Sequence, residues 1–313
     1  MLVKTLKFSI LKSLNKPTFM TNIVKNYFRV LEVISSLNCE LEYKSGVGRI
    51  HKMSDLEVIA LSLTAEFMSI DSENSLFKLV DTSQIPNLIE RSQFNKRRRK
   101  LFLFLEEVRA KLASRFLEFE DYFIVDSMPL EICKFARHRR AKICKSEFET
   151  APTKGFCASQ NNWFYGYKLH GVCSVSGVFH SLDITKAEVH DIHFLKNIKQ
   201  QMSDCVLLGD RGYLPESIQL DLFQTVNVKL ETPKRMNQRN YKPQPYIFRK
   251  SRKRIETLFS QLCDQFMIRR NYAKSFQGFK TRILAKITAL TLVQFINKFI
   301  FDRPINNIKN QTI

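Results

Sequence analysis

Residues 121–128, DYFIVDSM, mark the place where the patterning of the chain changes from helical to mixed. The run is short, apolar, and rich in aromatic and β-branched side chains, which is typical of a strand buried in a sheet. Further strand-like runs lie downstream at 164–175, 178–184, 205–209 and 226–231. Helical segments alternate with these strands or follow them, at 190–202, 215–225 and about 248–264. This order predicts a mixed α/β fold, in which helices flank a central mixed sheet.

The chain upstream of residue 121 shows helical patterning. Ser54-Asp55-Leu56-Glu57 is a capping box that leads into an apolar helical stripe, and residues 98–117 repeat apolar side chains at helical spacing. We therefore expect an all-helical region at 20–119, a mixed domain at 120–301 and a C-terminal tail at 302–313. Residues 1–19 are basic and lack acids, and the sequence leaves open whether they form a targeting peptide or an extension ahead of a second start at Met20.

The charge of the chain points to a polyanionic partner. Fifty Lys and Arg against 30 Asp and Glu give a formal net charge of +20, which exceeds that of an ordinary solvated surface. Nucleic acid is favoured over a membrane surface, because the charge is spread over several clusters instead of one amphipathic helix or tail. No apolar run reaches the roughly 18 residues of a membrane span. The seven scattered cysteines form no paired C-x-x-C motif, which indicates a soluble protein of the reducing cytoplasm without structural zinc or disulfides.

Three acids occupy positions from which they can line a cleft. Asp126 and Asp210 each come directly after an apolar strand, and strand ends line the ligand crevice of open α/β sheets. Glu256 lies beside the apolar stripe of the helix SRKRIETLFSQL. Each acid also has a simpler interpretation: either aspartate can form a turn or cap a helix, and Glu256 can pair with Arg252 one turn away.

Three carboxylates at one site repel each other unless cations neutralise them. Hard oxygen ligands favour two divalent ions, magnesium or alternatively manganese, and no cluster of Cys and His indicates zinc. Two such ions about 3.5–4 Å apart suit in-line phosphoryl displacement. The acids therefore make a candidate metal site for the cutting and joining of DNA.

Four ordered motifs accompany these acids: VDSMP around Asp126, WFYGYKLH at 163–170, LLGDRGY around Asp210 and RKRIETLFSQL around Glu256. Together with DITKAEVHD at 183–191, they resemble bacterial insertion-sequence transposases with a DDE domain, and most closely the insertion sequence 982 family. The resemblance runs from about Met20 to the C-terminal helix. It implies an RNase H-like catalytic domain at 120–301, and it carries the catalytic and metal-binding roles onto Asp126, Asp210 and Glu256.

The helix around the third acid departs from the pattern of many related transposases, which place Tyr, Arg, Glu and Lys at fixed intervals. Arg252 and Glu256 match that pattern, but Arg249 stands at the Tyr position and Cys263 at the Lys position. The roles of that Tyr and Lys therefore do not transfer to this chain. Only 46 positions separate Asp210 from Glu256, which leaves no room for an insertion domain.

Basic clusters supply the candidate DNA contacts. Residues 232–255 contain nine Lys or Arg and no acid, and the contacts we expect there are Arg235, Arg249, Lys250, Arg252 and Lys253. A solvated linker is the alternative for some of them. The cluster KRRRK at 96–100 adds Arg97 and Arg98, unless it is a solvated helix start. A third basic cluster lies at 134–145.

Three motif residues near the acids have a less definite role. Lys168 and His170 alternate on a strand and so face one side of the sheet, where both contact DNA phosphate if that side is the cleft. The alternative for His170 is a half-buried residue with its hydrogen bonds satisfied. We expect His190-Asp191 to cap a helix, and Trp163, the sole tryptophan, to pack against the protein and not to serve as a base-stacking platform.

The sequence thus predicts a transposase that cleaves the ends of an insertion sequence and transfers the strands into target DNA. Its expected partners are double-stranded DNA, comprising terminal inverted repeats and target, and further copies of the chain, without a membrane or a nucleotide cofactor. The helical region at 20–119 is expected to bind DNA or dimerise, and the protein to associate with the bacterial nucleoid. Two alternatives remain: a metal-dependent nuclease or resolvase that does not join strands, and an inactive DNA-binding remnant.

Overall fold

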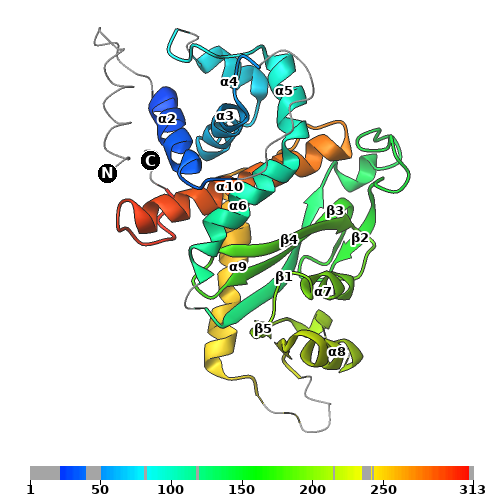
Figure 1. Ribbon diagram of the computed structural model, residues 1–313. Coiled ribbons are helices and arrows are strands. Elements are labelled where there is room, and N and C mark those ends of the chain that lie inside the picture. The colour runs from blue at the N-terminus through cyan, green and yellow to red at the C-terminus, as the bar shows by residue number, and fades with distance from the viewer. Residues whose placement is uncertain are drawn as a thin grey trace.

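The computed structural model describes residues 22–39, 51–80, 83–117, 120–213, 216–234, 241 and 243–309. Helices gather in one part of the molecule and the sheet in the other, and α10 lies between the two parts (Figure 1). Before the sheet come α2 (Asn22–Ser35), α3 (Asp55–Phe67), α4 (Glu73–Leu79), α5 (Arg91–Lys100) and α6 (Phe102–Ser114). The capping box predicted at Ser54 is confirmed, because Ser54 and Glu57 each accept the other's backbone N–H.

The remaining elements form and cover the sheet. Its strands are β1 (Tyr122–Glu131), β2 (Thr153–Cys157), β3 (Asn162–Ser174), β4 (Phe179–Lys186), β5 (Val206–Leu208) and β6 (Lys229–Glu231). The helices are α7 (Ile192–Ile198), α8 (Glu216–Val226), α9 (Tyr246–Asp264) and α10 (Phe276–Phe299), with short 3-10 turns η2 (Phe135–Arg137) and η3 (Arg211–Tyr213). The expected mixed α/β fold is confirmed. Strand β2 was not expected.

The sheet has the order β2-β3-β1-β5-β6, and β4 also pairs with β3. Strands β1, β3 and β4 are antiparallel neighbours, whereas β5 runs parallel to β1, and β6 parallel to β5. This is the RNase H-like arrangement that the resemblance implied. The turn from β3 to β4 lies at the predicted Ser176-Gly177, where the φ of +99° at Gly177 is one that side chains other than glycine rarely adopt.

The register of the sheet separates two faces with different helical cover. Asp126 is opposite Gly171 and Met128 is opposite Leu169, so these residues share one face with Ile124. That face packs against the apolar side of α9 and against α10 in the larger hydrophobic core. The other face, with Phe123 and Val125, packs against α7 and α8 in a second core. The side chain of Asp126 therefore belongs to the α9 face.

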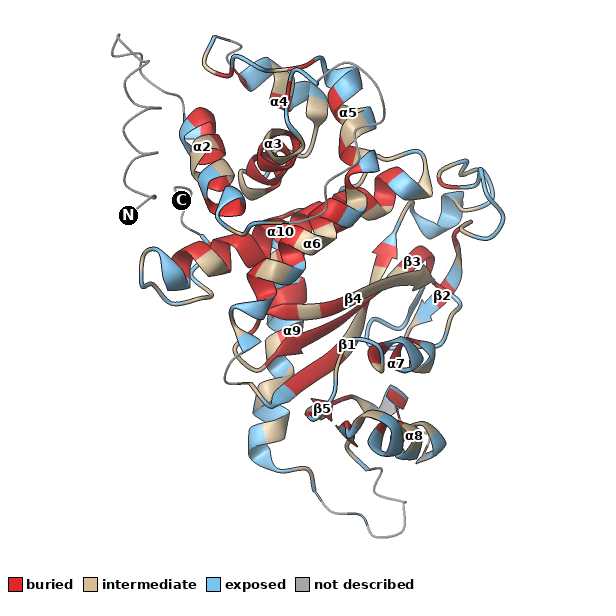
Figure 2. Ribbon diagram, in the orientation of Figure 1, coloured by how far each residue is buried: buried red, intermediate tan, exposed pale blue. Residues whose placement is uncertain are grey.

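Helix α10 joins the sheet to the helical part. It contacts α3, α5 and α6 on one side and α9 and β4 on the other, and it is buried along most of its length (Figure 2). One continuous hydrophobic core runs through α2, α3, α6, α9 and α10. The division at residue 119 stays a prediction, because α10 lies within 120–301 and completes the core of the upstream helices.

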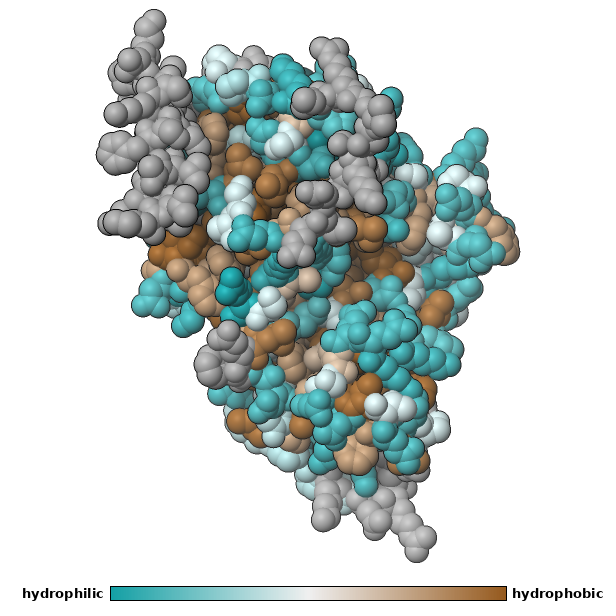
Figure 3. Space-filling model, in the orientation of Figure 1, coloured by the Kyte–Doolittle hydropathy of each residue, from teal (hydrophilic) through white to brown (hydrophobic). Residues whose placement is uncertain are grey.

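The exposed surface varies in hydropathy from place to place. Hydrophilic side chains dominate the exposed surface over α7 in the view of Figure 3, whereas hydrophobic side chains come to the surface near α2 and α6. Within the described ranges, no helix is long and apolar enough to cross a membrane.

Candidate active site

The two aspartates lie side by side because their strands are parallel neighbours. Ile124 of β1 is in register with Leu208 of β5, and Asp126 and Asp210 each follow two residues later. Neighbouring strands are about 4.8 Å apart, so the two acids lie at the same level of the sheet. Asp126 accepts the backbone N–H of Ser127 at 2.8 Å, and Asp210 accepts that of Gly212 at 2.7 Å. Asp210 thus follows the end of β5 as predicted, whereas the prediction that Asp126 ends its strand is wrong, because β1 continues to Glu131 in its pairing with β3.

Burial makes the negative charge of Asp126 costly. The carboxyl is half-buried, and its desolvation raises its pKa from 3.8 to about 7. The Ser127 N–H lowers the pKa, the neighbouring charge of Asp210 raises it, and the guanidinium of Arg252 lowers it again. A buried carboxyl beside a second carboxyl forms a site that a cation stabilises.

Helix α9 brings Arg252 and Glu256 to the same side of the sheet as Asp126. The apolar residues of α9 pack into the larger core beside Ile124 and Met128. Arg252 and Glu256 are one helical turn apart and share a helix face. Glu256 is exposed, and no ion pair joins it to Arg252 among the described residues. The structure therefore gives no support to the salt bridge that was the alternative for Glu256.

Glu256 does not lie close enough to Asp126 and Asp210 to form a metal-binding cluster with them. In the part of the chain that the structure describes, no three His, Cys, Asp or Glu side chains are grouped closely enough to hold a metal ion. The donors fit a hard divalent cation: Asp126 and Asp210 offer adjacent oxygens, and Glu256 lies on the helix that packs against the face of Asp126.

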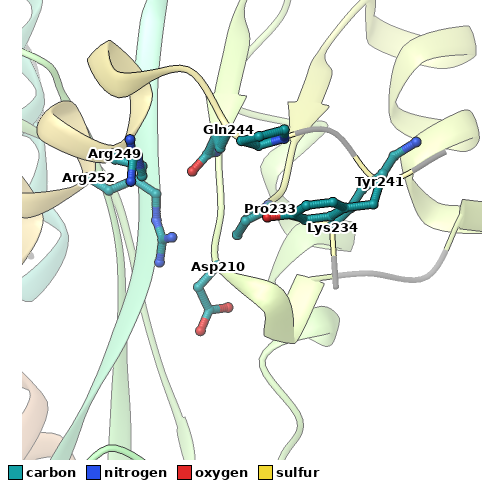
Figure 4. A pocket seen from close by; sticks show the side chains of 8 residues that line it. Asp210, Pro233, Lys234, Tyr241, Gln244, Arg249 and Arg252 are labelled. Carbon is teal, nitrogen blue, oxygen red and sulfur yellow. The ribbon is translucent and has the colours of Figure 1, made fainter. Parts of the chain in front are cut away.

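A cavity of about 440 Å³ opens beside Asp210 (Figure 4). Its walls carry positive charge and hydrogen-bonding groups: Lys234, Tyr241, Gln244, Arg249 and Arg252 line it together with Pro233 and Pro243. The arginines come from α9, and Lys234 and Tyr241 lie on the other side of the cavity. Such walls suit a phosphate next to the acids. The sequence did not single out Tyr241 or Gln244, because isolated polar residues in a linker carry no periodic signal.

The other residues expected to contact DNA in the segment 232–255 differ in placement. Arg249 and Arg252 line the cavity, whereas Lys250 and Lys253 are exposed on α9. Arg235 lies outside the described residues. The DNA contacts of this segment stay predictions.

Lys168 and His170 face the other side of the sheet. They are opposite Pro129 and Ser127 in the β1–β3 register, and so project away from the face of Asp126. Lys168 binds the Asp191 carboxylate at 3.0 Å and the carbonyl of Val189 at 2.9 Å. The expected phosphate contact of Lys168 beside the metals therefore has no support, since its charge is paired on the α7 side.

His170 is buried beneath α7. Its ring stacks on Phe194 with the centroids 5.2 Å apart, and its Nε2 lies 2.8 Å from the hydroxyl of Thr185. Desolvation lowers its pKa to about 4 against the opposing effect of Asp191. A neutral, enclosed imidazole cannot serve as a cationic phosphate contact. The structure thus favours a packed histidine, although the ring is fully buried instead of half-buried and, among the described residues, its Nδ1 has no hydrogen-bond partner.

The helix start at His190-Asp191 is capped differently from the usual pattern. The N–H of Ile192 donates to Nδ1 of His190 at 3.3 Å, while the Asp191 side chain makes no capping hydrogen bond. Asp191 instead pairs with Lys168. The expected cap is therefore supplied by the histidine alone.

Arg97 and Arg98 form ion pairs within the helical part. Arg97 pairs with Asp55 and donates to the carbonyl of Met53. Arg98 is only 6% exposed and pairs with Glu73 at 2.7 Å, with Glu66 at 3.9 Å. The DNA contacts expected for both arginines have no support here, because these guanidinium groups already neutralise acids of α3 and α4.

The family follows from comparison with known proteins. The pattern of the family described as "Transposase DDE domain" matches residues 118–292, from before β1 into α10. The chain belongs to this transposase DDE domain family. All three candidate acids lie inside the matched range. A solved structure, the Mos1 transposase paired-end complex with left transposon end, shares 12% identity over 93% of each chain with a TM-score of 0.21. No curated protein matches the chain.

Proposed function

We propose that this transposase cleaves DNA at the ends of a bacterial insertion sequence, of the 982 family, and transfers the cut strands into target DNA. The observation that carries the proposal is the pair Asp126 and Asp210, held at one level of neighbouring strands beside a basic cavity. Membership of the transposase family supports the same conclusion. Partners of this function are element-end and target duplexes, with more than one copy of the chain acting on them in the bacterial nucleoid.

Asp126, Asp210 and Glu256 are the residues that would hold two divalent ions, magnesium or alternatively manganese. When bound, such ions stabilise the charge that develops on the attacking and leaving oxygens of a phosphoryl transfer. The chain's own residues position the DNA: Arg249 and Arg252 project from α9 beside Asp210 and face the phosphate from the cavity wall. Lys250 and Lys253 extend this basic surface along α9.

The pKa of Asp126 bears on its role as a metal ligand. A carboxyl with a pKa of about 7 is in part protonated at neutral pH, and a protonated carboxyl is a poor metal ligand. Arg252 lowers that pKa and so favours the carboxylate. Arg252, which matches the family pattern beside Glu256, therefore also favours the charged form of Asp126 that binds a metal.

A nicking and strand-transfer assay tests this function. Labelled duplex carrying the element end is incubated with the protein and magnesium, and cut and joined products are separated on denaturing gels. We expect Asp126→Ala, Asp210→Ala and Glu256→Gln to abolish both products. Asp264→Asn is the matched control, since Asp264 is an exposed acid on the same helix as Glu256.

The products also separate the alternatives. Cutting without joining would identify a nuclease or resolvase, and binding without cutting would identify an inactive remnant. Undiminished cutting by the Asp126→Ala or Asp210→Ala protein would overturn the assignment of the acids.

A further inference from the structure

The loop between β1 and β2, residues 132–152, continues into the β2–β3 hairpin as a basic surface that the proposed reaction does not use. It carries seven basic side chains against the two acids Glu147 and Glu149: Lys134, Arg137, Arg139, Arg140, Lys142, Lys145 and, on β2, Lys154. All seven are exposed. None forms an ion pair with an acid of the described chain. Their charge is therefore free for a polyanion, unlike that of Arg97 and Arg98.

Two aromatic rings at the hairpin tip are exposed beside this charge. Phe156 and Trp163 are directly opposite each other in the β2–β3 register, and their ring centroids are 5.4 Å apart. Phe156 is 46% exposed and Trp163 57%. The expectation that Trp163 packs against the protein is therefore wrong, because the outermost strands leave one side of both rings without a covering element.

The rings and the charges lie on one face. Lys154 is opposite Tyr165, just as Phe156 is opposite Trp163. Lys154 and Phe156 are two residues apart on β2, and Trp163 and Tyr165 are two residues apart on β3, so these four side chains share a side of the hairpin. The basic loop is held to that side by Tyr165, whose ring lies 5.6 Å from Nζ of Lys145 and 5.7 Å from the ring of His138. Figures 1 and 2 show the loop beside β2 and β3 with a largely exposed surface.

We propose that this aromatic–basic face, made of Phe156, Trp163, Lys154 and the loop 132–152, binds a single-stranded segment of DNA. Cations alone would fit a duplex equally well. The exposed rings decide between the two, because the faces of unpaired bases are open to stacking while those in a duplex are covered by neighbouring bases. A base stacks on Trp163 and Phe156, and the loop cations bind the adjoining phosphates.

This face is separate from the acids. Gly171, the residue opposite Asp126, comes eight positions after Trp163 on β3, which amounts to about 26 Å of strand. The inference rests on the proposed function only in that the protein handles DNA with unpaired segments. Binding at the face is therefore measured without metal and without catalysis.

The sole tryptophan provides a direct test. The full-length protein, with chelator present, is titrated with oligothymidine of about 20 nucleotides, which exceeds the usual site size, and the fluorescence of Trp163 is followed. We expect the oligonucleotide to quench the fluorescence, less so at high salt, and a blunt duplex of equal length to quench it weakly. Asp126→Asn protein should quench equally, which separates this result from any failure of the catalytic assignment.

Variants locate the binding. By anisotropy of a labelled oligonucleotide, Trp163→Ala and Phe156→Ala should bind roughly five- to hundredfold more weakly. Phe223→Ala is the matched control, because Phe223 is 53% exposed on α8, away from the hairpin. Unfolding curves of the variants verify that an exposed ring was removed without loss of the fold.

Three results would overturn the proposal. These are a failure to bind the oligonucleotide, binding that leaves the fluorescence of Trp163 unchanged, and wild-type affinity in the Trp163→Ala protein. A change of Trp163 fluorescence with protein concentration in the absence of DNA, lost in Phe156→Ala, would overturn the proposal and assign the face to contact between copies of the chain.

Discussion

Single residues decide the chemistry of the site, and the sequence revealed some of them better than others. Asp126 and Asp210 were predicted because each acid directly follows a run of apolar residues, although Asp126 lies within β1 and not after it, and the parallel register places the two acids together. The internal roles of Arg97 and Arg98 were not visible. Their partners Asp55, Glu66 and Glu73 lie on other helices, and a run of basic letters does not show which charges are neutralised through space.

Removing the charge of Asp126 should stabilise the metal-free protein at high pH. The folded pKa of about 7 exceeds the unfolded value of 3.8, so the folded state binds the extra proton between these two pH values. Stability of the wild type therefore falls as pH rises through this window. We expect Asp126→Asn to raise the free energy of unfolding by up to about 4 kcal/mol at pH 8 and hardly at all below pH 4.

Urea unfolding with chelator at the two pH values measures this difference. Asp264→Asn, which removes an exposed acid of α9, is the matched control. An equal effect of Asp126→Asn at both pH values would show that the charge of Asp126 is not the cause.

At the scale of elements, buried charged side chains join α10 to the upstream helices. Lys286 of α10 is buried and donates to the Glu66 carboxylate of α3 and to the carbonyl of Phe266. Arg98 of α5 lies near the same carboxylate. Periodicity predicted the helices, but it could not predict this cluster, because the partners Glu66 and Lys286 are 220 residues apart.

Removal of one buried partner should therefore cost more than removal of both. Lys286→Met leaves the Glu66 charge without its closest cation, and we expect a loss of about 3–5 kcal/mol in the free energy of unfolding. The double variant Lys286→Met with Glu66→Leu should recover much of that loss. Urea unfolding of the two single variants and the double variant gives the coupling, and additive losses would contradict the assigned contact.

The short strand β2 shows why one element escaped prediction. Its sequence, TKGFC, contains a glycine and a lysine and is only five residues long. It forms because β3 extends beyond β1 and offers free backbone groups at its far end. Trp163 lies in this same far end of β3, beyond the pairing with β1.

At the scale of the whole molecule, the core passes through α10 and binds the helical part to the sheet. Leu63 of α3, Leu105 of α6 and Leu290 of α10 belong to one buried cluster with Ile124 of β1. The predicted division at residue 119 follows the change in patterning along the chain. The hydrophobic core extends across that boundary, since α10 is the last of the described helices in the sequence and packs between the two parts.

A fragment of residues 20–119 should consequently fail to fold alone. Without α10, the apolar sides of α3 and α6 face water, and exposed apolar surface costs about 25 cal/mol per Å². We expect the fragment to show weak helical circular dichroism and no cooperative thermal transition, whereas the full chain unfolds in one transition. Addition of a second fragment, residues 120–313, should restore helicity, because α10 then completes the core. A cooperative transition in the isolated fragment would establish residues 20–119 as an independent domain and would reduce α10 to a docking contact.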